Sequence, residues 1–173
     1  MLLTGCVSLD QRSYPTDWPP ISLSSEACPD LSGIYDNGDL GAHPIWLAAW
    51  VLPSTTYPLK NIDRVHVTGP TNGTVRFRLL KALDTVVAVR EWHQGVDFQC
   101  DHGWLVPHSI DLAFAIPAWT GSVQARFART VDGQFVAEVT EGGGGVALVV
   151  PMLSMYRHWH LYPVAVNSGS IAP

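Results

Sequence analysis

The stretch SVQARFARTVDGQFVAEVT, residues 122–140, decides the fold class of this chain. Apolar and polar residues alternate on both sides of Asp132-Gly133, with Phe127 before the pair and Phe135 after it. A period of two is typical of a strand with one buried face, and Asp-Gly favours the tight turn of a hairpin. The stretch therefore predicts two antiparallel strands, over residues 122–131 and 134–140.

Similar patterns recur along the rest of the chain. Further strands are predicted over residues 64–68, 74–80, 85–92, 97–100, 104–106, 112–116, 146–150 and 155–164. Turns are predicted at Asn72-Gly73, Asp84 and Asp101-His102-Gly103, whose residue types favour tight turns. The four glycines of residues 142–145 predict a loose turn, because glycine loses much backbone entropy when it is ordered. About eight to ten short strands at regular spacing are typical of an antiparallel barrel or sandwich.

One apolar run does not alternate. Residues 45–52 read Ile-Trp-Leu-Ala-Ala-Trp-Val-Leu between Pro44 and Pro53, which suit the start and the end of a helix. The run predicts a short helix, with a buried strand as the alternative, and the helix either packs on the core or covers a barrel mouth. The fold class is therefore mainly β: a single antiparallel barrel or sandwich, a lipocalin-like meander included, with one short helix.

Composition limits the class of protein. The chain has 173 residues, of which 47% are hydrophobic and 14% charged, which suits one well-buried domain. The net charge is −5 and the basic residues are scattered, which argues against a nucleic-acid partner. The chain lacks a run of about 18 apolar residues, so no transmembrane helix is predicted.

The N-terminus carries a recognisable motif. Leu3-Thr4-Gly5-Cys6 resembles the lipobox of bacterial lipoproteins, and Cys28-Pro29-Asp30-Leu31-Ser32-Gly33-Ile34-Tyr35 resembles the start of the folded domain in envelope lipoproteins of unknown activity. The resemblance implies that Cys6 carries acyl chains, palmitate among them, and that residues 1–5 are the remnant of a signal peptide. Val7 follows the cysteine in place of aspartate, which in such proteins favours the outer membrane, facing the periplasm.

The lipoprotein resemblance and the composition together predict a domain organisation. Residues 7–27 are rich in serine, proline and aspartate, which is typical of an extended linker. We therefore expect a disordered, lipidated tether over residues 6–27, a β domain over residues 28–166 and a frayed tail over residues 167–173.

If Cys6 is lipidated, two cysteines remain, Cys28 and Cys100. An even pair in an oxidising compartment predicts a disulfide, which closes a loop of roughly 70 residues and contributes about 4 kcal/mol. Two free buried thiols are the alternative. A pair this far apart, without a Cys-x-x-Cys motif, is poor evidence for zinc.

The histidines are the first candidates for chemistry. His158-Trp159-His160 on a strand would set His158 and His160 on one face, about 7 Å apart. A metal site would need a third ligand, for which the candidates are His93, His102, His108, Asp97 and Asp101. Two surface histidines are the alternative, and we predict no metal and no cofactor.

Other polar groups have ordinary explanations. Asp97, Asp101 and His102 flank Cys100, but turn chemistry explains them, and the chain lacks a nucleophile elbow, a P-loop and a dinucleotide fingerprint. We therefore predict no enzymatic activity. The arginines on the predicted strands form either an anion-binding stripe or cross-strand pairs with Glu91 or Glu138; they are Arg76, Arg78, Arg90 and Arg126.

Together these observations predict a lipid-anchored envelope protein that acts through protein contacts as a structural or accessory component. Its expected partners are the membrane, through the lipid anchor, and another envelope protein. The alternative is lipocalin-like binding of a small apolar ligand.

Overall fold

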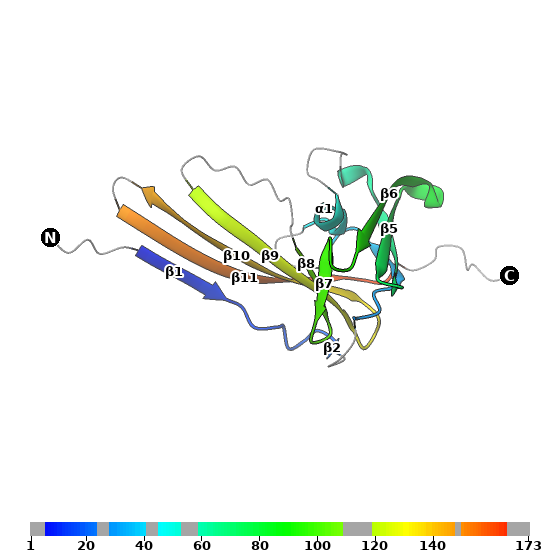
Figure 1. Cartoon of the computed structure of the whole chain (residues 1–173), viewed down its shortest axis with the longest axis horizontal. Coiled ribbons are helices and arrows are strands. Elements are labelled where there is room, and N and C mark those ends of the chain that lie inside the picture. Colours follow the sequence, from blue (N-terminus) through cyan, green and yellow to red (C-terminus); the bar gives the residue numbers. More distant parts are fainter. Residues whose placement is uncertain are drawn as a thin grey trace.

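The computed structural model describes residues 6–23, 28–40, 45–52, 59–108, 119–147 and 150–165. They form two β-sheets and one short helix (Figure 1), so the predicted mainly β class is confirmed. The larger sheet has the order β1 (Cys6–Gln11), β11 (Val150–Tyr162), β10 (Phe135–Ala147), β9 (Trp119–Thr130), β8 (Trp104–Pro107) and β7 (Phe98–Asp101), and β2 (Ile21–Ser22) pairs with β9. The smaller sheet has the order β3 (Gly33–Asp36), β4 (Arg64–Thr71), β5 (Thr74–Leu80) and β6 (Val86–His93).

The two sheets pack face to face as a sandwich. Tyr35 of the smaller sheet lies 5.4 Å from Phe135 of the larger one, between ring centroids, and Trp92 lies 6.2 Å from Phe127. Neighbouring strands of each sheet run antiparallel except β1 and β11, which are parallel. The predicted hairpin meander is present within each sheet. The described strands do not close into a lipocalin-like barrel, because the chain leaves one sheet after β6 and enters the other at β7.

The predicted helix is α1 (Leu47–Val51), and it packs on the core, as one of the two interpretations proposed. Leu47, Trp50 and Val51 are buried. The helix is held at its start by Asn37, whose Oδ1 accepts a hydrogen bond from the backbone N–H of Ala48 at 2.8 Å. Two short 3₁₀ turns, η1 (Leu59–Asn61) and η2 (Ala82–Asp84), complete the described elements.

The turns lie at the positions that the residue types predict. Asn72 and Gly73 have φ of +50° and +72° and close the β4–β5 hairpin, in which Thr71 pairs with Thr74. Gly133, with φ of +87°, closes the β9–β10 hairpin, and its N–H donates to the carbonyl of Thr130 at 2.9 Å. Glycine and asparagine tolerate positive φ, which explains these positions.

The glycine run was predicted wrongly. Residues 142–145 are not a turn but the continuation of β10, which reaches Ala147 before β11 begins at Val150. Gly142 pairs with Met155 on one side and Ser122 on the other, so both neighbouring strands bind its backbone. The two ladders offset the entropy that glycine loses on ordering. The strand predicted over residues 112–116 and the tail over residues 167–173 lie outside the described residues.

Residues 6–23 also differ from the disordered tether predicted for residues 6–27. β1 pairs with β11, and β2 pairs with β9. Between them Tyr14 packs edge-on against Trp159 at 5.1 Å and against Trp18 at 5.9 Å. Burial of these aromatic rings offsets the cost of ordering a segment whose composition resembles a linker.

Candidate functional site

The larger sheet extends beyond the smaller one as an arm (Figure 1). We define the arm as residues 6–10 of β1, 119–125 of β9, 141–147 of β10 and 150–156 of β11. In Figure 1 it points away from α1, β5 and β6. Only its inner end reaches the core of the sandwich, where Ala125 is buried and Val123 packs against the core.

Four apolar side chains gather on one face of the arm. Val7 and Leu9 are 60% and 64% exposed, and their register partners Leu153 and Met155 are 54% and 40% exposed. Residues paired across two strands point to the same face, so these four form one continuous surface. We call it the apolar patch.

The next strand adds no side chains to the apolar patch. Gly144 pairs with Leu153, and Gly142 pairs with Met155, so bare backbone lies beside the patch on β10. The stretches that make up the outer part of the arm contain no charged residue: residues 6–9, 119–125, 142–147 and 150–156. An uncharged region with exposed apolar side chains of this kind is a candidate interaction surface.

Farther along the same face lies a network of ion pairs. Glu138, 4% exposed, accepts a hydrogen bond from Nε of Arg126 at 2.6 Å and lies 3.2 Å from Nε of Arg157. Trp104 covers the guanidinium of Arg126 at 4.2 Å from the ring centroid, a cation–π contact. This network confirms the predicted cross-strand pair of Arg126 and Glu138.

The other arginines do not form an anion-binding stripe. Arg76 binds Glu91 across β5 and β6, with Nε 2.7 Å from Oε1, as the cross-strand interpretation predicts. Arg90 lies opposite buried Phe77, and so shares its face of the sheet, whereas Arg76 and Arg78 belong to the other face. The structure therefore separates the arginines over two faces and two sheets.

His158 and His160 lie on one face of β11 as predicted, but in different surroundings. His160 is 3% exposed, and its Nδ1 contacts the carboxylate of Asp39. Its Nε2 is buried, and no described residue gives it a hydrogen-bond partner. His158 is half-buried and stacks on Tyr156, and burial lowers its pKa.

The buried histidine borders an aromatic cluster behind α1. The ring of Trp50 lies 5.9 Å from that of His160, and its Nε1 donates to the hydroxyl of Tyr162 at 2.8 Å. The Tyr162 hydroxyl donates in turn to the carbonyl of Ile45 at 3.1 Å, and burial raises the pKa of Tyr162. Sequence reasoning missed Asp39, because it lies 121 residues from His160 and the turn Asp36-Asn37-Gly38-Asp39 gives no sign of the contact.

The remaining candidate ligands belong to turns. The Asp97 carboxylate accepts a hydrogen bond from the backbone N–H of His93 at 2.8 Å, and His108 Nδ1 lies 2.9 Å from the carbonyl of Val96. Asp101 contacts His102 next to it, in the hairpin between β7 and β8. Within the described residues, no three side chains of histidine, cysteine, aspartate or glutamate group as metal ligands.

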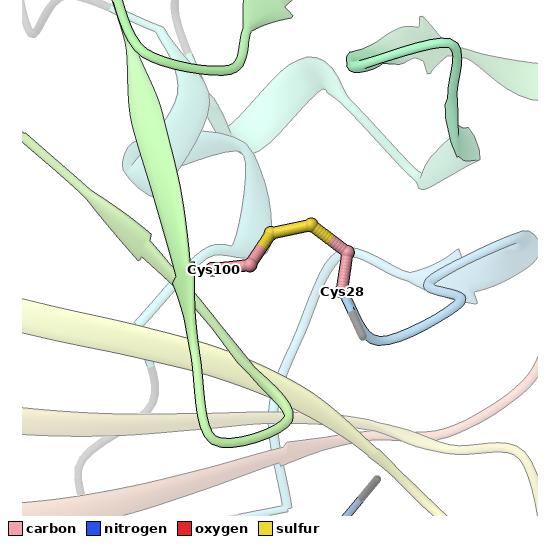
Figure 2. The surroundings of a disulfide bond; sticks show 2 residues. All are labelled: Cys28 and Cys100. Carbon is pink, nitrogen blue, oxygen red and sulfur yellow. A yellow bond between two sulfur atoms is a disulfide. The ribbon is translucent and has the colours of Figure 1, made fainter. Parts of the chain in front are cut away.

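Cys28 and Cys100 form a disulfide, as predicted, with their Cα atoms 5.1 Å apart (Figure 2). Cys28 lies just before β3 of the smaller sheet, and Cys100 lies on β7 of the larger one. The bond therefore joins the two sheets across a sequence separation of 72.

A second exposed apolar feature lies at η2, between β5 and β6. Leu83 is 95% exposed and has φ of +58°, and Asp84 follows with φ of +56°. Arg64 binds the Asp84 carboxylate at 2.8 Å. A leucine held exposed in the left-handed region is unfavourable both for its backbone and for its side chain, which motivates a functional explanation.

Comparisons with models of protein families, with curated proteins and with solved structures give no match. Of the helices in the described part of the chain, none has the length and the apolar character required to cross a membrane.

Proposed function

We propose that this protein is a lipid-anchored component of the bacterial cell envelope that acts through contact with another protein. In this proposal Cys6 carries the acyl chains, in the outer membrane and facing the periplasm. The protein is a structural or accessory component, without catalytic chemistry of its own.

The proposed contact role is supported by one observation, the exposure of the Leu83 side chain. Among the large hydrophobic side chains that the structure describes it is the most exposed, at 95%, and its ion-paired neighbour Asp84 holds the loop against β4. Val86 and Val89, 48% and 52% exposed, continue the apolar character along β6, one of the two edge strands of the smaller sheet. An exposed edge with apolar side chains is a typical surface for strand pairing with a partner.

The anchor and the contact surface would lie at opposite ends of the molecule. β1, which begins at Cys6, belongs to the arm, whereas β5 and β6 lie at the other end (Figure 1). A protein held in a membrane at one end and exposing apolar side chains at the other is suited to bind a second envelope component.

Cell fractionation tests the anchor. The envelope fraction is first washed with alkaline carbonate, which releases proteins held only by non-covalent surface contacts. The parent protein is then expected to stay in the envelope fraction and the Cys6→Ser variant to be released into the soluble fraction, because thioether attachment requires the cysteine sulfur. If both proteins are soluble, the proposed anchor is wrong.

Photo-crosslinking tests the contact. A photoreactive amino acid at position 83 is expected to give a discrete adduct in intact cells. The same residue at position 96 is the matched control, because Val96 is also an exposed apolar residue, 72% exposed, and lies in another turn. Equal labelling at both positions contradicts a specific contact at Leu83.

The alternative, a lipocalin-like protein that binds a small apolar ligand, has less support. The fold is an open sandwich, and aromatic side chains, among them Phe77, Phe127 and Phe135, fill the space between the sheets.

A further inference from the structure

The first strand leaves no free chain between Cys6 and the sheet. β1 begins at Cys6, and Val7 already pairs with Leu153. At about 3.3 Å per residue, Leu9 lies roughly 10 Å along the strand from Cys6. Acyl chains on Cys6 would therefore keep the arm within a few residues of the bilayer rather than at the end of a flexible linker.

We propose that the apolar patch rests on that bilayer, with the arm lying flat in the membrane interface. This inference rests on the proposed lipid anchor and adds a second, non-covalent attachment to it. The patch presents Val7, Leu9, Leu153 and Met155 on one face, and the glycines of β10 beside them keep that face level.

The charges of the larger sheet are arranged to match a lipid surface. Three charged residues of β1, β9, β10 and β11 lie on the face that carries the patch. They are Arg126, Arg157 and buried Glu138. The guanidinium-bearing side chains are 43% and 38% exposed, whereas that of Glu138 is 5% exposed, so the accessible charge is positive. Such a face suits anionic headgroups, although the whole protein carries −5.

The acidic residues of the arm lie on its opposite face. Asp10 and Glu141 both pair with Tyr156, and the alternation of each strand sets them on the side away from the patch. Trp159 lies on the patch side, next to the arginines, where Tyr14 packs edge-on against it at 5.1 Å. The two faces of the sheet are therefore different in charge and polarity.

The edges of the sheet determine how deep the arm can lie. β1 is an edge strand, and its outer N–H and C=O groups need water or headgroups as partners. The hydrocarbon core would leave these groups unsatisfied, which excludes upright insertion of the arm. A flat orientation keeps both edges at headgroup depth, while the patch reaches the acyl boundary about 5–10 Å below.

Vesicle binding by the unlipidated full-length chain tests this inference. The Cys6→Ser protein is mixed with vesicles of phosphatidylglycerol and phosphatidylethanolamine, and bound protein is measured by co-sedimentation. We expect it to bind, and we expect Leu9→Asp and Leu153→Asp each to weaken binding by about tenfold or more, since each removes a leucine contact with the acyl region. Leu9→Met is expected to bind as the parent does, because it stays apolar.

Val96→Asp is the matched control, because it adds the same charge at an exposed apolar residue outside the patch. It is expected to bind as the parent does. Circular dichroism, and the absence of free thiols in each Cys6→Ser protein, check that every variant is folded with its Cys28–Cys100 disulfide.

Three results would overturn the inference. The first is a Cys6→Ser protein that does not bind the vesicles, and the second is equal binding by the parent and both aspartate variants. The third is a dimer in analytical ultracentrifugation that Leu153→Asp abolishes, since a second copy would then cover the patch. Cell fractionation of the parent tests the anchor separately: a chain that binds vesicles through the patch but is not lipidated in cells overturns the proposed anchor alone.

Discussion

Asp39 and His160 are paired inside the core, where the carboxylate of Asp39 contacts Nδ1 of the imidazole. The side chains are 0% and 4% exposed, respectively. Asp39 follows β3 of the smaller sheet and His160 lies on β11 of the larger one, so the pair connects the two layers of the sandwich.

Removing the Asp39 carboxylate is expected to destabilise the fold. Asp39→Ala should lower the free energy of unfolding by about 3–5 kcal/mol, because it leaves a buried polar partner without compensation. Urea denaturation of the Cys6→Ser protein measures this. Asp101→Ala is the matched control, because Asp101 contacts His102 in the same way but both side chains are exposed, 61% and 84%. Its effect should stay within about 0.5 kcal/mol, and equal effects of the two variants would contradict the importance of burial.

Loss of the disulfide is expected to lower the free energy of unfolding. The double variant Cys28→Ser with Cys100→Ser should be less stable by about 4 kcal/mol, because the bond restricts a long loop of the unfolded chain. Urea denaturation checks this against the oxidised parent. Thiol titration should find none in the oxidised Cys6→Ser protein and two after reduction under denaturing conditions, and free thiols before reduction would contradict the bond.

Gly142 of β10 and Gly69 of β4 should respond to alanine in opposite ways. A Cβ atom at Gly142 would meet its nearest neighbours at 4.0 Å, so Gly142→Ala should stabilise the protein by about 0.5 kcal/mol through the unfolded state. A Cβ atom at Gly69, where φ is +99°, would lie 2.6 Å from the carbonyl oxygen of Thr74. Gly69→Ala should therefore destabilise by more than about 1 kcal/mol. Thermal unfolding compares the two, and the same sign for both would contradict this account.

Alkaline pH should destabilise the fold through Tyr35. Burial raises the pKa of Tyr35 from 10.0 to about 12, and its hydroxyl donates to the carbonyl of Leu31 at 2.9 Å. The unfolded chain loses this proton near pH 10 and the folded chain near pH 12. Stability is therefore complete below pH 10 and falls by about 3 kcal/mol between pH 10 and 12.

Urea denaturation at pH 9, 10, 11 and 12 measures that loss. Tyr35→Phe should be less stable at pH 9, since the hydrogen bond is gone, but its stability should fall less steeply above pH 10. A slope unchanged by Tyr35→Phe would show that other groups cause the alkaline loss.

The parts of the fold that follow local rules could be predicted from the sequence. Asp132-Gly133 and the alternation around it identify the β9–β10 hairpin, and the prolines around residues 45–52 identify α1. Residues 142–145 could not be predicted in this way, because the glycines are ordered by two neighbouring strands rather than by their own preferences. The segment after β1 was misjudged for a related reason: proline and serine dominate its composition, whereas Tyr14 and Trp18 determine its packing.

For the candidate site, the individual residues could be predicted from the sequence better than their surroundings in the fold. Cys28 and Cys100 form a pair, and Arg126 binds Glu138, as cysteine count and strand register allow. The apolar patch depends on the parallel pairing of β1 with β11, which joins residues 146 positions apart, such as Cys6 and Met152. Alternation within one strand cannot reveal such a partner.

The pairing of the first strand with the last also sets an order of events during synthesis. β1 is an edge strand whose neighbour is β11, so its ladder cannot be completed until the chain has been made as far as Arg157, the partner of Gln11. A chain that emerges N-terminus first can complete the β9–β10 hairpin before that point, because those contacts are local. Cys6 therefore stays outside the sheet until β11 has been made, and during that interval its sulfur would be open to the lipidation proposed above.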